Sequence, residues 1–129
     1  MDTSAFAETM LQAIVNDMEF FLANSQPDVV LEFPFAASVG MVALVEGKDK
    51  ARKFLETLPS VLPDVVLKNV RVTPFADPNA VLLEYDSDCP KAKNYKNQYI
   101  TIMKFRDGKL TLFKEHFDTV EAKRALGGG

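Results

Sequence analysis

Apolar residues recur at three- and four-residue spacing in two stretches of the first half of the chain. The first stretch predicts an amphipathic helix over about residues 4–22, with Asp2 or Ser4 as its N-terminal cap. The second predicts a helix that begins near Lys48 and is closed by Pro59 and Pro63. The first half is therefore expected to form two helices, and the apolar stripe of each must pack against another part of the fold.

The remaining patterns are typical of strands. Residues 29–35 and 41–45 are expected to form short strands, the first ending near Pro34. From about residue 65 onward, apolar and polar residues alternate with a period of two, with a turn at residues 77–79. Helices followed by long antiparallel strands indicate an α+β fold, in which a curved sheet of about five or six strands buries one face under the helices and encloses a pocket. A single domain over residues 1–127 is expected.

The clearest local signal is a β-hairpin over residues 98–118, with Asp107-Gly108 as its turn. Pairing Phe105 with Leu110 in a regular ladder assigns alternate residues to the two faces of the sheet. One face would then carry Gln98, Ile100, Ile102, Phe113, Glu115 and Phe117. The other would carry Tyr99, Thr101, Met103, Phe105, Leu110, Leu112, Lys114, His116 and Asp118.

Glu115 is the main candidate for chemistry, because it is a carboxylate set into a mostly apolar face. In an apolar pocket, loss of hydration raises the pKa of a carboxyl group and makes it a general acid or base near neutral pH. A Glu115 that pairs with Lys or Arg at the rim, or that lies exposed at a strand end, would have no such role. The facing pattern favours the pocket.

Composition narrows the possible partners. The 129-residue chain has a net charge of −3 and no basic cluster, which argues against nucleic acid, because such binding depends on Lys and Arg contacts to phosphate. The first residues lack the basic region of a secretory signal, so none is expected, and no apolar run approaches the roughly 20 residues of a spanning helix. The lone Cys89 and the absence of a Cys/His cluster predict neither a disulfide nor a metal site. We expect a cytoplasmic protein without metal or cofactor.

The elements and their order resemble the SnoaL-like and ketosteroid-isomerase-like branch of the nuclear-transport-factor-2-like superfamily. Residues 46–127 are most similar to the phenazine-biosynthesis A/B proteins, through Gly47-Lys48-Asp49-Lys50, Pro63-Asp64, Asp77-Pro78-Asn79, Tyr95 with Asn97, Asp107-Gly108-Lys109, Glu115 and Arg124-Ala125-Leu126-Gly127. The resemblance implies a cone, in which a curved antiparallel sheet wraps around N-terminal helices and leaves a pocket. It also implies an acid/base role for Glu115, which aligns with a pocket glutamate of the phenazine proteins.

Two positions depart from the catalytic sets of these relatives. Phe54 stands where the resemblance places a histidine of the phenazine proteins, and Phe33 stands in the region of the catalytic aspartate of the steroid isomerases. Two functions therefore stay open. One is an acid/base enzyme (isomerase, cyclase or dehydratase) acting on a largely apolar carbonyl or polycyclic compound, with Glu115 as proton shuttle. The other is a non-catalytic ligand-binding or dimerisation module on the same fold.

The expected pocket combines an apolar wall with a few polar contacts to a small apolar or aromatic ligand. Its residues are Phe33, Phe54, Tyr85, Tyr95, Asn97, Ile100, Ile102, Phe113 and Phe117. His116 is expected at the surface or an interface, and Asp118 in a C-terminal capping or a surface role. The other face of the hairpin is too apolar for a solvated sheet surface, and a homodimer through this outer face is the simplest cover for it. The family resemblance implies the same dimer.

Overall fold

The computed structural model describes residues 2–127, which form four helices, a short 3-10 helix and one six-stranded sheet. The helices are α1 (Thr3–Asn16), α2 (Met18–Ala23), α3 (Lys48–Val61) and α4 (Thr119–Leu126), with the 3-10 helix η1 at Ala36–Val39. The strands are β1 (Ser25–Glu32), β2 (Leu44–Glu46), β3 (Val66–Pro74), β4 (Ala80–Cys89), β5 (Tyr95–Arg106) and β6 (Lys109–Phe117). Their order in the sheet is β2-β1-β6-β5-β4-β3. All neighbours are antiparallel except β1 and β6, which are parallel.

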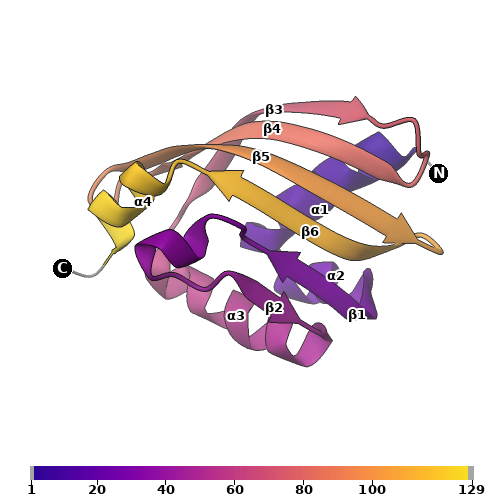
Figure 1. The fold of residues 1–129 in the computed structure, drawn as a ribbon, viewed down its shortest axis with the longest axis horizontal. Coiled ribbons are helices and arrows are strands. Elements are labelled where there is room, and N and C mark those ends of the chain that lie inside the picture. Colours follow the sequence, from indigo (N-terminus) through magenta and orange to yellow (C-terminus); the bar gives the residue numbers. More distant parts are fainter. Residues whose placement is uncertain (1, 128–129) are drawn as a thin grey trace.

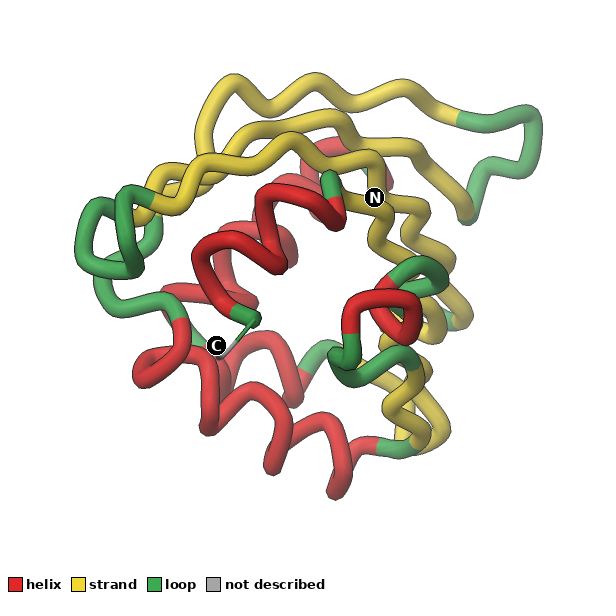
Figure 2. Tube along the Cα trace, turned by 60° about the vertical axis from the view of Figure 1, so that its left-hand side comes forward, coloured by secondary structure: helices red, strands yellow, loops and turns green. Residues whose placement is uncertain are grey.

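The sheet curves around the helices, which confirms the predicted α+β architecture. Figure 1 shows α1 behind the long strands and α3 beside β1 and β2. In the rotated view of Figure 2 the strands bend around the helices, which lie inside the curve. Helix α4 contacts β5 and η1, so it closes one end of the space that the sheet and the other helices enclose.

The predicted first helix is broken into two at Asp17. This residue has φ −153° and ψ 80°, outside the helical region, and its carboxylate accepts a hydrogen bond from the Phe20 amide at 3.1 Å. Asp2 caps α1 by accepting from the Ala5 amide at 3.2 Å, as one of the two predicted caps. Helix α3 continues through Pro59 rather than ending there.

A β-bulge in the hairpin corrects the predicted faces of the sheet. Phe105 pairs with Leu110 as expected, but Lys104 pairs with Leu112, so Thr111 is an extra residue on β6. The Thr111 hydroxyl donates to the Lys104 carbonyl oxygen at 3.1 Å. Because one inserted residue reverses the facing of everything beyond it, the prediction that Glu115 shares its face with Ile100 and Ile102 was wrong.

The inner face instead joins alternate residues of β5 to those of β6. Met103 lies opposite Phe113, Thr101 opposite Glu115, and Tyr99 opposite Phe117. The side chains predicted to form an apolar outer patch are mostly core: Tyr99, Thr101, Met103, Phe105 and Leu110 are all buried. That patch therefore gives no support for a dimer.

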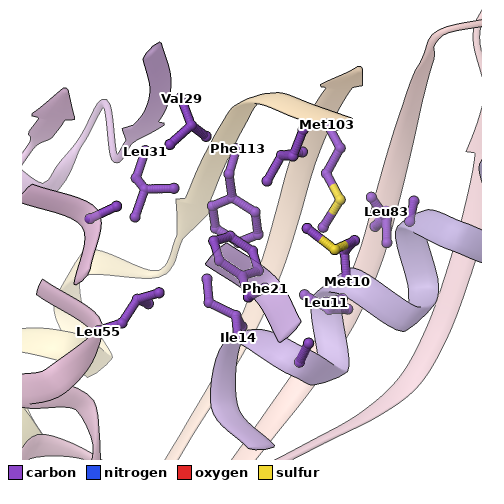
Figure 3. Close-up of a cluster of buried hydrophobic side chains, with 14 of the residues drawn as sticks. Met10, Leu11, Ile14, Phe21, Val29, Leu31, Leu55, Leu83, Met103 and Phe113 are labelled. Atoms are coloured by element: carbon purple, nitrogen blue, oxygen red, sulfur yellow. The ribbon is translucent and has the colours of Figure 1, made fainter. Parts of the chain in front are cut away.

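The core lies between this inner face and the helices. Figure 3 shows Met10, Leu11 and Ile14 of α1 on the same side of the sheet as Leu83 and Met103. Phe21 of α2 and Phe113 of β6 are also fully buried there. Burying these side chains fixes the curved sheet on its helices, since each large apolar side chain contributes roughly 1.5–3 kcal/mol when removed from water. Among residues 2–127, no helix has the length and apolar character needed to cross a lipid bilayer.

Candidate active site: a carboxylate in an apolar cavity

A cavity of about 690 Å³ lies between the inner face of the sheet and helices α1, α3 and α4. Most of its wall is apolar, and this volume lies within the range of small-molecule sites. Three aromatic rings form a continuous part of the wall: Phe33 packs against Phe54, with ring centroids 5.3 Å apart, and against Phe113 at 6.4 Å. Such a wall is suited to a flat or polycyclic ligand.

Glu115 brings a carboxylate to this wall from β6. The Tyr85 hydroxyl donates to Glu115 Oε2 at 2.5 Å, and the same hydroxyl lies 2.7 Å from Thr101 Oγ1. Tyr85 comes from β4 and Thr101 from β5, so three neighbouring strands hold the carboxylate in place. Tyr85 and Thr101 are fully buried, whereas Glu115 keeps a part of its surface toward the cavity.

Burial raises the pKa of Glu115 from 4.5 to about 7, because the charged form loses its hydration. The hydrogen bond from Tyr85 opposes this effect by stabilising the carboxylate. Burial, and next the negative charge of Glu115, raise the pKa of Tyr85 well above its ordinary value. Tyr85 therefore remains a protonated donor while Glu115 titrates near neutral pH.

A second chain of hydroxyl groups lies beside the first. Ser87 Oγ is 2.8 Å from the Tyr99 hydroxyl, which is 3.1 Å from the Tyr95 hydroxyl. The Asn97 carboxamide donates to the Tyr95 hydroxyl at 2.7 Å and accepts from the Asp118 amide at 2.9 Å. Tyr95 and Tyr99 line the cavity, so this chain brings two phenol groups to the same wall as Glu115.

The structure brings most, but not all, of the predicted pocket residues to the cavity. Those that line it are Phe33, Phe54, Tyr95, Phe113, Glu115 and Phe117. Tyr85 and Asn97 lie behind the wall and reach it through Glu115 and Tyr95. Ile100 and Ile102 are on the opposite face of the sheet, because the bulge reverses the register; Ile100 is 47% exposed.

Sequence reasoning missed Tyr99 and Thr101, which it assigned to the outer face, and it did not place Lys50 and Lys53 in the pocket, although both line the cavity from α3. Lys50 lies four residues before Phe54 and three before Lys53 in α3, and that helical spacing could have identified them. No signal in the sequence marks Thr111 as a bulge.

Three other residues considered for chemistry lie apart from the cavity. His116 is on the outer face, where its ring packs against Phe35 with centroids 5.3 Å apart. Asp118 is the N-cap of α4 and accepts from the amides of Val120 and Glu121, so of its two expected roles the structure shows capping. Cys89 is buried, and its burial raises the pKa of the thiol. Within residues 2–127, no three His, Cys, Asp or Glu side chains are grouped so as to hold a metal ion.

Comparison with known proteins agrees with this architecture. The chain is 28% identical over 105 residues to an uncharacterised PhzA/B-like protein of Pseudomonas aeruginosa, covering 79% of this chain and 73% of the relative. Among solved structures, an NTF2-like protein of unknown function from Burkholderia pseudomallei superposes with a TM-score of 0.83 at 17% identity, covering 99% of each chain. The BvnE pinacolase of Penicillium brevicompactum does so with a TM-score of 0.80 at 17% identity, covering 95% of this chain and 90% of the other. Residues 6–113 match the SnoaL-like domain, and the chain therefore belongs to the SnoaL-like family within the NTF2-like superfamily.

Proposed function

We propose that this protein moves a proton on a small, largely apolar carbonyl or polycyclic compound, as an isomerase, a cyclase or a dehydratase does. The observation that carries the proposal is the environment of Glu115. Its carboxyl group faces an apolar cavity, is oriented by the Tyr85 hydroxyl, and has a pKa raised to about 7. A general base is most effective when its pKa is close to the working pH.

Glu115 is suited to both halves of such a reaction. At neutral pH its ionised form accepts a proton from a carbon next to the substrate carbonyl, and its protonated form returns that proton to a different atom. Tyr85 remains neutral throughout and donates to the carboxylate, which fixes the direction of the basic oxygen. Thr101 in turn fixes Tyr85.

The second hydroxyl chain offers a donor for the substrate oxygen. Ser87, Tyr99 and Tyr95 have one hydroxyl hydrogen each, but only two contacts join their oxygens. One hydrogen is therefore left without a partner among these groups. If Ser87 donates to Tyr99 and Tyr99 to Tyr95, the free hydrogen belongs to Tyr95, which lines the cavity. A donor at this place would stabilise the negative charge that develops on a carbonyl oxygen.

The alternative is a protein that binds a ligand without converting it. It is favoured by Phe33 and Phe54, which present apolar rings where related enzymes are expected to carry an acid and a histidine. No histidine lines the cavity, and Glu115 is its one carboxylate among the described residues. The similar pinacolase shows only that an enzyme exists on this fold.

A deuterium-exchange experiment separates these functions. Aromatic acids, steroids and polyketide-like ketones are first screened by thermal shift, because a ligand of the native state raises the melting temperature. Each compound that binds is then incubated in D₂O with wild type or Glu115→Gln, and deuterium incorporation next to the carbonyl is followed by NMR. We expect Glu115→Gln to bind but to exchange at least about a hundredfold more slowly.

Glu121→Gln is the matched control, since Glu121 lies on α4 and is not part of the cavity wall. Its exchange rate should equal that of wild type. Equal exchange in wild type and Glu115→Gln would contradict the assignment of Glu115. Binding to both proteins without exchange in either would establish the binding function instead.

We also infer that a second copy of the chain covers the outer face of the sheet. The support is the exposure of Ile100 on this face and the exposed Phe35 ring, which packs on His116. Both are large apolar side chains left in water by the single chain. Sedimentation analysis should show a dimer that Ile100→Lys converts to a monomer. A monomeric wild type at high concentration would contradict this inference.

A further inference from the structure

The mouth of the cavity is identified by those lining residues that are also exposed to solvent. Val42 and Leu44, from the segment between η1 and the end of β2, are about half exposed. Opposite them, α3 contributes Val61 and two lysines, Lys50 and Lys53. Figure 1 shows the segment from η1 to β2 next to α3, and β2 contacts α3. The mouth is therefore a rim of exposed apolar side chains with two cations on one side.

Within residues 2–127, neither lysine is neutralised by an acidic group. Among the described residues, no carboxylate lies within ion-pair distance of Lys50 or Lys53. The acidic residues of α3, Asp49 and Glu56, act instead on Arg52, which also pairs with Glu19 of α2. The helix thus carries its paired charges around Arg52 and its unpaired cations at the cavity.

Lys50 and Lys53 are connected to Glu115 by the phenylalanine side chains of the cavity wall. Lys50 lies one helical turn before Phe54, about 6 Å along the helix axis. Phe54 contacts Phe33, and Phe33 contacts Phe113, which is on the same strand face as Glu115. An aromatic wall therefore runs from the two ammonium groups at the mouth to the carboxyl group inside.

We propose that the natural ligand is an aromatic or polycyclic acid, whose anionic group binds Lys50 and Lys53 while its apolar body lies along the phenylalanine wall. This inference rests on the proposed function and specifies its substrate class. The lysines would select acids over neutral analogues and orient them with the apolar end toward Glu115. Both charges lie at the solvent edge, so binding there costs little desolvation.

A matched pair of fluorescent probes tests the proposal without requiring turnover. Anilinonaphthalenesulfonate and N-phenylnaphthylamine share one aromatic skeleton, and only the first carries a sulfonate. We expect wild type to bind the sulfonate more tightly. In the double variant Lys50→Gln/Lys53→Gln its affinity should fall about three- to tenfold, the range for two exposed ion contacts, while the affinity for the neutral probe stays the same. Gln has a helix propensity close to that of Lys, so α3 should be preserved.

Two control variants test whether the probes bind in the cavity beside Lys50 and Lys53. Lys104→Gln/Lys114→Gln makes the same change in net charge on the outer face of the sheet and should leave both affinities unchanged. Thr57→Trp places a large ring at the cavity wall and should weaken both probes. Raising the ionic strength from about 0.01 M to about 1 M shortens the Debye length from about 30 Å to about 3 Å, and it should remove the preference for the sulfonate.

Three results would overturn the proposal. They are failure of wild type to bind the sulfonate, an unchanged sulfonate affinity in Lys50→Gln/Lys53→Gln, and an equal loss in the outer-face control. Failure of the proposed function is distinguishable, because Glu115→Gln should retain the preference for the sulfonate whether or not Glu115 is catalytic. A protein that shows this preference but exchanges no deuterium would be an acid-binding protein rather than an enzyme.

Discussion

Two glutamates near the end of the chain have opposite electrostatic environments. Glu115 lies on the inner face of β6, and burial raises its pKa to about 7. Glu121 lies in the first turn of α4, where a hydrogen bond from Arg124 lowers its pKa to about 2. Arg124 donates to both Glu121 oxygens, and the Lys96 amide donates to one of them.

The difference lies in what replaces water around each carboxylate. Glu115 receives one neutral donor in exchange for its hydration, whereas Glu121 receives a full positive charge while it remains accessible to solvent. The first arrangement makes a group that gives and takes protons near neutral pH. The second makes a permanently ionised group that fixes α4 against β5. Changes to the register of β6, to either carboxylate or to its donor should alter this contrast by very different amounts.

The bulge at Thr111 sets the facing of β6, and inserting one alanine between Leu112 and Phe113 should abolish the contrast by moving Glu115 to the outer face. The insertion shifts the register beyond Leu112 by one residue, so that Phe113 would pair with Ile102 and Glu115 with Ile100, and both would turn outward. Loss of the buried Phe113 alone should cost about 3–5 kcal/mol, so we expect a severe loss of stability in urea denaturation. Insertion of one alanine after Lys93, in the loop between β4 and β5, is the control and should be milder. A stable insertion variant in which Glu115 retains its raised pKa would contradict this dependence on the register.

The same bulge shows how far the sequence could predict this site. Alternation and turn residues correctly located the hairpin, its Asp107-Gly108 turn and the helices that cover the sheet, because these depend on local patterns. The inward facing of Glu115 was also predicted, but from a register in which Ile100 was its neighbour. Thr101 is its neighbour instead. A single unpaired residue has no compositional mark, so the partners of Glu115 could only come from the three-dimensional pairing.

Glu115→Gln should stabilise the protein at high pH. Because the pKa of Glu115 rises from 4.5 in the unfolded chain to about 7 in the fold, the folded state holds a proton that the unfolded state has already lost between these values. Stability therefore falls as pH rises through this window, by roughly 3 kcal/mol in total, and the loss is complete above about pH 7. A neutral Gln avoids this loss and can still accept from Tyr85.

Urea denaturation of wild type and Glu115→Gln across this pH range measures the effect, since the contributions of other groups cancel in the difference. The two proteins should be similar near pH 4 and should diverge by up to about 3 kcal/mol near pH 8. A difference that does not depend on pH would show that Glu115 is not desolvated in the native state.

Tyr85→Phe should raise the pKa of Glu115 further. The hydroxyl stabilises the ionised carboxylate, so its removal leaves burial unopposed. A hydrogen bond to a charged group corresponds to about one pKa unit or slightly more. Carboxyl-carbon NMR titration measures the shift directly. Tyr95→Phe is the matched control, because the Tyr95 hydroxyl bonds to Tyr99 and Asn97 instead. A lower pKa in Tyr85→Phe would mean that water enters and replaces the lost donor.

Glu121→Gln should have the smallest effect and the opposite pH dependence. Because the folded-state pKa of Glu121 is depressed from 4.5 to about 2, its contribution to stability is present above pH 4.5 and is lost as pH falls through about 2. The variant should therefore be slightly less stable than wild type near neutral pH and equal to it in strong acid. High salt should also reduce the difference, since the pair with Arg124 is exposed. If Glu121→Gln instead stabilised the protein as pH rose, as expected for Glu115→Gln, the contrast between the two carboxylates would have to be abandoned.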